Sequence, residues 1–287
     1  MSIRVVTDST CDLPETIAAE YGVTVIPAYI NIGDRSYLDG VELSRREFYE
    51  MLPETEHIPM TSAPSPGAFV RAYEGLAAEG ATEILSVHIS ASLSAMLNAA
   101  NAAAAATDAI SVTLFDSTQL TLGTGLLALE AAKAAAEGWS MAEVVAVLEE
   151  MAARTYSFAA LDTLEFLRRG GRVTQLQYNL GSLLNVKPVL TMYNGELTME
   201  RVRTRRRAIE YLLKRVSDLG PLEQLHLLHA NALDRVDSLR GRVERLLPKG
   251  RMPMVVEVTP VIGAHVGPGA VGLVCVKARA GRPGSSS

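Results

Sequence analysis

The sequence has few aromatic residues, few cysteines and no excess of basic charge. Aromatic residues make up only 5% of the 287 residues, yet hydrophobic residues reach 48%, so aliphatic side chains must build the core of a globular protein. The formal net charge of −5 argues against a nucleic-acid-binding protein, because such proteins need a basic surface. The longest alanine-rich run, residues 99–106, is too short to cross a membrane.

The two cysteines, Cys11 and Cys275, lie near opposite ends of the chain. This low count excludes a disulfide-based scaffold and favours a reducing compartment. Residues 1–10 already have the pattern of a strand, so we expect no signal peptide. Together these features predict a cytoplasmic protein.

Several catalytic signatures are also missing. There is no GxxxxGKS/T loop and no GxGxxG after a strand, which disfavours nucleotide phosphates as ligands. The GxSxG turn of serine hydrolases is absent. His88 lies inside a predicted strand, where we expect it to be packed, and His226 and His229 should face opposite sides of another strand, which disfavours a metal site. Cys11 has no basic partner nearby that would activate it as a nucleophile.

The first half of the chain alternates predicted strands and helices, with Asp12 at the expected N-cap of the first helix. This alternation predicts an α/β domain over residues 1–156, with a mainly parallel sheet covered on both faces. The expected strands are residues 3–7, 23–32 (with a possible break at Pro27), 84–89 and 110–115. The expected helices are residues 13–21, 43–52, 67–79, 93–106, 123–137 and 139–154.

The second half predicts a mixed α+β domain over residues 157–280, followed by a flexible tail over residues 281–287. Tyr193-Asn194-Gly195-Glu196 is typical of a hairpin turn, because Asn-Gly adopts the positive dihedral angles that tight turns need. The expected strands are residues 188–192, 224–230, 254–259 and 272–277. The expected helices are one that ends at residues 170–171, and residues 174–184, 207–219 and 235–247.

Hydroxyl groups collect where the predicted parallel strands end. The stretch SVHISASLSAMLNAA places Ser90, Ser92 and Ser94 directly after a strand, residues 7–10 and 116–118 are similar, and Thr61-Ser62 precedes another helix. Ligands of open parallel sheets bind at this edge, and helix N-termini there favour anions. Helix capping needs only about one such residue per turn, so the surplus predicts a neutral cradle for a small carboxylate.

The stretch IGAHVGPGAVG around His265 is rich in glycine and predicts a loop before the last strand. Two interpretations stay open on the residues alone. The histidine either belongs to an ordinary exposed turn, or it brings an imidazole to the ligand.

Six stretches, in order along nearly the whole chain, resemble the DegV family, the fatty-acid-binding subunits of bacterial fatty acid kinase. VTDSTCDLP resembles the family's opening strand and turn, TSAPSPGAF its TSQPS signature, and SASLSAMLNAA its SSxLSGTYQSA segment. LEFLRRGGRV, KPVL and HVGPGAVG complete the set.

The resemblance implies a two-domain fold that encloses one long-chain fatty acid, with the tail in an apolar tunnel. A separate ATP-dependent kinase subunit would phosphorylate the carboxylate for phospholipid synthesis, so this chain would present a substrate without catalysing a reaction and would need no cofactor. Thr61 and Ser94 would contact the carboxylate, with Ser62 close by. His265 would assist from the second domain, and Arg172 would add positive potential.

The sequence departs from the family pattern at Ala63, Ala95 and Met96, where the family has Gln, Gly and Thr, so acyl-chain preference does not follow from the resemblance. Two alternatives remain. One is an enzyme acting on a small carboxylate or phosphate through Ser94, Cys11 or His265. The other is a regulatory sensor that binds a fatty acid without passing it to a kinase.

The stretch RVRTRRRAIEYLLKR, residues 201–215, concentrates positive charge. Its simplest interpretation is a solvated strand end followed by an amphipathic helix. Nucleic acid, anionic lipid and the kinase are the other partners that such a segment could bind. Arg203 matches the family's VRT segment and is predicted to face the kinase, and the remaining arginines suit transient contact with an anionic membrane surface.

Overall fold

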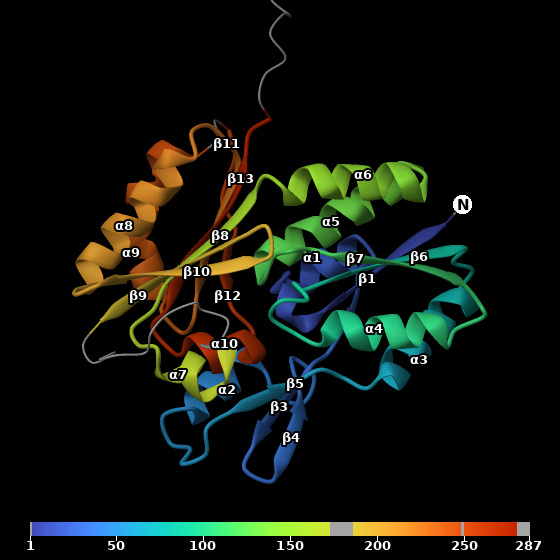
Figure 1. The fold of residues 1–287 in the computed structure, drawn as a ribbon, viewed down its shortest axis with the longest axis horizontal. Coiled ribbons are helices and arrows are strands. Elements are labelled where there is room, and N and C mark those ends of the chain that lie inside the picture. The colour runs from blue at the N-terminus through green and yellow to red at the C-terminus, as the bar shows by residue number, and fades with distance from the viewer. Residues whose placement is uncertain (1, 173–185, 248–249, 280–287) are drawn as a thin grey trace, which may run out of the picture.

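The computed structural model describes residues 2–172, 186–247 and 250–279 (Figure 1). Its strands form three sheets. The predicted fold class, a mainly parallel first sheet followed by a mixed α+β region, is confirmed.

The first sheet has four parallel strands in the order β2-β1-β6-β7. Its two central strands, β1 and β6, are almost wholly buried, which fits a parallel sheet with helices on both faces. In Figure 1, α5 and α6 lie on one side of it and α3 and α4 on the other. The elements are β1 (Ile3–Asp8), α1 (Glu15–Glu20), β2 (Thr24–Ile26), α3 (Pro66–Ala78), β6 (Glu83–His88), α4 (Met96–Ala105), β7 (Ser111–Asp116), α5 (Leu122–Ala136) and α6 (Met141–Ala152).

A small antiparallel sheet, which the sequence did not indicate, lies below the first one. It consists of β3 (Tyr29–Ile32), β4 (Arg35–Leu38) and β5 (Met60–Ser62), and helix α2 (Arg45–Met51) lies between β4 and β5 in the chain. The strand expected over residues 23–32 breaks at Pro27, so its two halves join different sheets. This break brings Thr61 on β5 beneath the main body of the protein.

The third sheet is mixed and has six strands in the order β10-β9-β8-β13-β11-β12. Only β11 and β12 pair in parallel. The elements are β8 (Thr155–Ala160), α7 (Glu165–Arg169), β9 (Lys187–Tyr193), β10 (Glu196–Val202), α8 (Arg205–Asp218), β11 (Leu222–His229), α9 (Leu233–Val243), β12 (Val255–Glu257), α10 (Pro260–Val266) and β13 (Val271–Lys277). The expected boundary at residue 156 falls within β8, and the predicted β9–β10 hairpin is confirmed.

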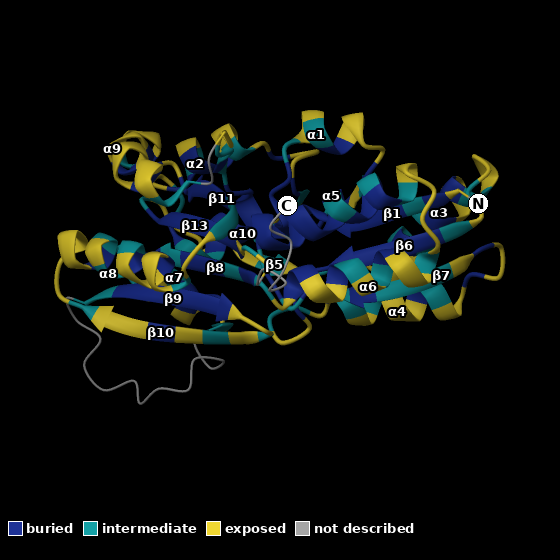
Figure 2. Cartoon of the chain, turned by 90° about the horizontal axis from the view of Figure 1, so that it is seen from above, coloured by how far each residue is buried: buried dark blue, intermediate teal, exposed yellow. Residues whose placement is uncertain are grey.

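The core lies between the sheets and continues from one to the next. Apolar side chains on the inner face of the six-stranded sheet, such as Leu190 and Leu228, belong to the same cluster as the parallel sheet and α10. A second cluster lies on the outer face, under α8 and α9. Figure 2 shows the buried strands running continuously through the middle of the molecule, with the exposed helix faces outside.

Three local expectations differ from the structure, and a fourth cannot be compared with it. Asp12 does not cap α1: it adopts a left-handed conformation, and its buried carboxylate accepts a hydrogen bond from the Thr259 amide at 2.6 Å. Strand β8 was not predicted at all. The glycine-rich stretch around His265 is not simply a loop, because its first half forms helix α10. The helix expected over residues 174–184 lies outside the described residues.

Candidate functional site

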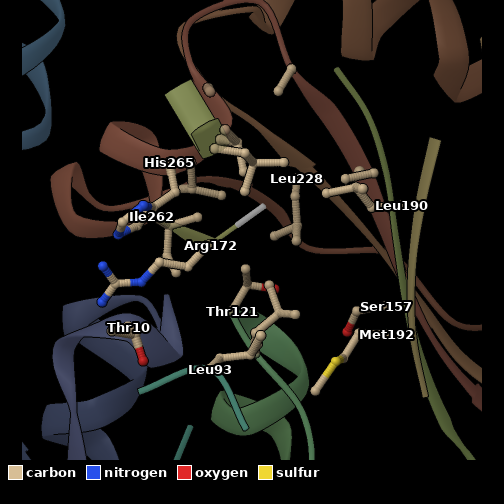
Figure 3. Close-up of a pocket in the computed structure, with 18 of the residues that line it drawn as sticks. Thr10, Leu93, Thr121, Ser157, Arg172, Leu190, Met192, Leu228, Ile262 and His265 are labelled. Carbon is tan, nitrogen blue, oxygen red and sulfur yellow. The ribbon is translucent and has the colours of Figure 1, made fainter. Parts of the chain in front are cut away.

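A cavity lies where the carboxyl end of the parallel sheet meets the inner face of the six-stranded sheet (Figure 3). As expected, the turns that follow β1, β6 and β7 meet at one edge, because these strands are parallel neighbours. The lining residues come from the segments that follow the parallel strands, from the other two sheets, and from α7 and α10 with the residues around them. They are Thr10, Thr61, Ile89, Leu93, Ser94, Leu120, Thr121, Ser157, Phe158, Ala159, Leu167, Arg172, Leu190, Met192, Leu197, Leu228, His229, Ala230, Val258, Val261, Ile262, His265, Val266, Ala270, Val271 and Gly272.

His265 and Thr61 form the polar centre of this cavity. The Nε2 atom of His265 lies 2.8 Å from the Thr61 hydroxyl, although 204 residues separate them in the sequence. Figure 3 shows the Arg172 guanidinium and the His265 imidazole on the same side of the cavity. The structure therefore brings together three of the residues that the resemblance implied: Thr61, His265 and Arg172.

The His265 imidazole is held in its neutral form. Burial, together with the positive charge of Arg172, lowers the pKa of His265 to about 4. Its Nδ1 atom is buried and has no hydrogen-bond partner among the described residues. This atom lies against the backbone of Gly170, and a buried polar atom without a hydrogen bond carries a cost in free energy.

Arg172 provides the positive charge next to this histidine. Its Nη1 atom donates to the Gly170 carbonyl at 2.6 Å, so the side chain folds back toward the residue two positions earlier. Burial lowers the pKa of the Arg172 guanidinium, but an arginine remains charged at neutral pH. No carboxylate among the described residues pairs with this half-buried cation, so the site favours an anionic group in the cavity.

Helix α10 is fixed by close contacts at glycines. A Cβ atom at Gly263 would lie only 2.5 Å from the Tyr49 hydroxyl, and one at Gly267 would overlap the Phe166 ring. One at Gly170 would overlap His265 Nδ1. These glycines let α2 and α7 approach α10 closely, so they position the imidazole.

Two hydrogen bonds anchor the start of α10 to the first half of the chain. The Thr259 amide, at the N-cap, donates to Asp12, and the Tyr49 hydroxyl donates to the Val258 carbonyl at 3.3 Å. This explains why Asp12 is buried instead of capping α1. Residues far apart in the sequence thus set where His265 lies.

Of the three serines after β6, only Ser94 lines the cavity. Its hydroxyl also accepts a hydrogen bond from the Met96 amide at 3.2 Å, which supports the start of α4. Ser92 instead donates to the Gly195 carbonyl at 2.8 Å, and Ser90 contacts Ser92. The surplus hydroxyls therefore join the turn after β6 to the β9–β10 hairpin.

Two other predicted residues lie outside the cavity. Ser62 is exposed, and its hydroxyl accepts from the Asn31 amide group at 3.3 Å, because neighbouring residues of strand β5 face opposite sides. Ser62 is therefore not brought to the carboxylate position that the resemblance implied. Arg203 is exposed in the turn between β10 and α8 and takes no part in the cavity.

Sequence reasoning did not single out three hydroxyls that line the site, Thr10, Thr121 and Ser157, although Thr10 lies in a stretch that it described as hydroxyl-rich. The Asp8 carboxylate accepts hydrogen bonds from the Thr10 amide and hydroxyl and from His88 Nδ1, the last at 2.8 Å, so it fixes Thr10 at the cavity. Thr121 has a positive φ of 52° and a buried hydroxyl with no partner among the described residues. The hydroxyl-rich stretches after β1 and β7 were the sequence pattern from which Thr10 and Thr121 could have been identified.

Apolar side chains form the remaining walls. Leu190, Met192 and Leu228 stand on β9 and β11, and Figure 3 places them away from the Arg172 guanidinium. Val258, Val261 and Ile262 close the side near α10. The cavity is thus polar at one end and apolar along most of its length.

The catalytic alternatives gain no support from the groups around this cavity. Cys11 is buried, and burial raises the pKa of its thiol, so no thiolate forms at neutral pH. His88 is packed as expected, fully buried between Asp8 and Ser86. Within residues 2–172, 186–247 and 250–279, no group of three or more histidine, cysteine or acidic side chains is arranged to hold a metal ion.

None of the helices in these same residues is long and apolar enough to cross a membrane.

A cavity with apolar walls and a few polar groups at one end is typical of a protein that holds an amphipathic ligand.

Residues 2–278 match the family model described as "Uncharacterised protein, DegV family", and the chain belongs to that family. A DegV domain-containing protein of Streptomyces coelicolor is 36% identical over 275 residues, which are 95% of this chain and 97% of that protein. The resemblance drawn from the six sequence stretches is therefore confirmed.

Solved structures agree with this assignment. A DegV family protein from Thermus thermophilus, described by its fatty acid binding, superposes with a TM-score of 0.87 at 36% identity, covering 97% of this chain and all of that one. DegV from Bacillus subtilis, described as a fatty acid binding protein, gives a TM-score of 0.86 at 32% identity, covering 96% of this chain and all of that one.

Proposed function

We propose that this protein binds one long-chain fatty acid in the cavity and presents its carboxylate to a separate kinase subunit. The observation that supports this most is the division of the cavity into a polar end around His265, Thr61 and Arg172 and long apolar walls. The fatty acid binding described for the Thermus and Bacillus relatives supports it further.

The carboxylate would lie at the polar end. Arg172 would balance its charge, Ser94 and Thr61 would donate hydroxyl hydrogen bonds, and His265 would hold Thr61 in place through Nε2. Hydrogen bonds to a charged group contribute roughly 1.5–3 kcal/mol each. A polar end with one cation and several hydroxyls would orient a single carboxylate.

The acyl tail would supply most of the affinity. A tail of about fifteen methylenes, at roughly 0.8 kcal/mol for each buried methylene, gives on the order of 12 kcal/mol before the costs of binding. The polar residues therefore decide which end of the ligand faces the polar corner, and the walls decide how tightly it is held. Loss of one hydroxyl should change presentation more than retention.

Transfer to a kinase is the second part of the proposal. The carboxylate oxygen would attack the γ-phosphate of ATP, with ADP as the leaving group, and the partner subunit would supply the bound ATP. The exposed Arg203 is our candidate contact for that partner, and the neighbouring arginines of residues 201–207 would favour collection of the ligand at an anionic membrane surface. The proposal places the chain's working environment in the cytoplasm, where ATP is available.

Mass spectrometry of the native protein and of its organic extract tests the binding step. We expect one long-chain fatty acid per chain in the wild type and in Ser94→Ala, with Ser62→Ala as a control because its hydroxyl faces away from the cavity. If neither the purified protein nor the protein supplied with fatty acids holds lipid, the binding proposal is wrong.

Addition of kinase and ATP tests the presentation step on the same samples. We expect acyl phosphate from the wild type and Ser62→Ala, and at least about tenfold less from Ser94→Ala and Arg203→Gln at equal lipid content. Because Ser94 also supports the start of α4, Thr61→Val serves as a second variant. If the wild type binds lipid but no acyl phosphate forms, the carrier proposal is wrong and the protein is better described as a regulatory sensor of fatty acids.

A further inference from the structure

We infer that the protein has a second binding site, for a phosphate group, in a pocket between α8 and α9. Its floor belongs to the apolar cluster on the outer face of the six-stranded sheet, and Val271 is the one residue that its lining shares with the fatty-acid cavity. Its lining residues are Ala160, Leu161, Asp162, Arg205, Arg206, Ala208, Ile209, Arg235, Ser238, Leu239, Arg242, Gly269 and Val271. The cavity volume is about 220 Å³.

Four arginines surround this pocket, and two of them are already held in place. Arg205 binds both carboxylate oxygens of Asp162, with Nη2 at 2.9 and 2.7 Å. Arg235 donates from Nη1 to the same carboxylate at 2.9 Å and to the Gly269 carbonyl. Lys187 Nζ also lies 3.7 Å from Asp162. One carboxylate therefore positions three cations and can neutralise only one of them.

The other two arginines leave further positive charge unbalanced. Arg206 lies 3.7 Å from Glu210, and both side chains are largely exposed, so this ion pair is weak. Arg242 has no ion pair or hydrogen bond among the described residues. The four lining arginines, together with Lys187 next to Asp162 outside the pocket, share two carboxylates, and an anion bound in the pocket would relieve their mutual repulsion.

The geometry of the two helices favours the same class of ligand. Arg205 and Arg206 begin α8, and Arg235 lies in the first turn of α9, so the pocket opens beside the positive ends of both helix dipoles. Guanidinium groups match phosphate oxygens in a two-pronged geometry, and a dianion can engage several arginines at once. A phosphate monoester fits these features better than a single carboxylate does.

The floor of the pocket adds an apolar component. Ala160, Ala208, Leu239 and Val271 are all buried beneath the arginine rim. The pocket therefore suits a phosphate attached to a small organic group, and the phosphate could come from a soluble ester or from a lipid headgroup. Both sources share the chemistry that the arginines recognise.

Calorimetric titration of the full chain with inorganic phosphate and glycerol 3-phosphate tests the soluble source. Flotation with vesicles of phosphatidylcholine, with and without phosphatidic acid, tests the lipid source. We expect saturable binding to at least one phosphate probe, weakened about tenfold in Arg242→Gln, which removes one charged hydrogen-bond donor. Arg240→Gln is the matched control, because it removes the same charge from the same helix, yet Arg240 pairs with Asp237 and does not line the pocket.

The two arms identify the source of the phosphate. Saturable binding of a soluble probe indicates a phosphate ester in solution, and binding only to vesicles with phosphatidic acid indicates a lipid headgroup. Equal weakening in Arg242→Gln and Arg240→Gln would overturn the inference, since it would indicate general attraction to a basic surface. Absence of saturable binding in every arm would also overturn it. Fatty acid content, measured on the same samples, separates this result from the proposed function.

Discussion

The two ends of the fatty-acid cavity are built in different ways. The polar end depends on a few atoms brought together by close backbone approaches: Gly170 against His265, Gly267 against Phe166, and Thr61 from a separate small sheet. The apolar end consists of aliphatic side chains such as Leu190 and Leu228 on the six-stranded sheet. The polar end therefore tolerates few substitutions, whereas at the apolar end many side chains contribute to the same burial.

This difference separates orientation from affinity. Hydrogen bonds require distances near 2.8 Å and a defined direction, while burial of an acyl chain depends mainly on the apolar area removed from water. Single substitutions at the polar end should therefore have large effects on stability or on ligand orientation. Substitutions along the walls should act gradually. The following predictions are ordered from the largest expected effect to the smallest.

The largest effect is expected for Gly170→Ala. The backbone of Gly170 is helical, with φ of −73°, so alanine suits the chain itself, but its Cβ atom would overlap His265 Nδ1. We expect a loss of about 3 kcal/mol in the free energy of unfolding, the upper range for overpacking, measured by urea denaturation. Fatty acid retention should fall as well, because the imidazole must move.

Gly241→Ala is the control for this substitution. Gly241 lies in helix α9, and a Cβ atom there would meet nothing within 4 Å. Alanine should stabilise that helix by about 0.5–1 kcal/mol, because it reduces the conformational entropy of the unfolded chain. If Gly170→Ala unfolded at the same urea concentration as the wild type, the close approach of α7 and α10 would not be what fixes the polar end.

A smaller effect is expected from the protonation of His265. Its pKa of about 4 in the folded protein is below its ordinary value of 6.5. The unfolded chain therefore takes up a proton first, so the stability that this group contributes is present above about pH 6.5 and is lost as the pH falls toward about 4. Because the imidazole is only partly buried, we expect a loss of about 2 kcal/mol.

Comparison with His265→Gln isolates this contribution from that of other titrating groups. Between about pH 7 and about pH 4, the free energy of unfolding measured by urea denaturation should fall by about 2 kcal/mol less in the variant than in the wild type. A bound carboxylate should raise the pKa of His265, because it favours the imidazolium, so the loaded protein should lose less stability than the empty one. Equal declines for wild type and variant would show that His265 does not titrate in this way.

Much of the fold could be predicted from the sequence, because its signals are local. The apolar runs at residues 84–89 and 110–115, each followed by hydroxyls and a helix, were sufficient to predict the parallel sheet and the edge where its turns meet. Asn194-Gly195 was sufficient to predict a hairpin. Ser94 lines the cavity as expected at that edge, since the carboxyl ends of parallel strands converge there.

The parts that were missed depend on distant partners. Strand β8 follows α6 after only two residues, and it pairs with β9 and β13, which lie further along the chain. Helix α10 contains Gly263 and ends at Gly267, which weakens its helical pattern, although Thr259-Pro260 is a recognisable helix start. The Thr61–His265 contact joins α10 to β5, another strand that was not predicted, so residue patterns alone could not establish it.

The smallest effect is expected at the apolar wall, from Met192→Leu. Met192 is buried and lines the cavity, and this exchange nearly conserves volume, so the free energy of unfolding should change by less than about 1.5 kcal/mol. Total bound fatty acid should stay unchanged while the distribution of chain lengths in the organic extract shifts, because a branched, stiffer side chain reshapes the wall. Met151→Leu, which changes a buried methionine of α6 outside the lining, should leave that distribution as it is. A large loss of bound lipid in Met192→Leu alone would mean that the wall depends on individual side chains as strictly as the polar end does, and the contrast between the two ends would fail.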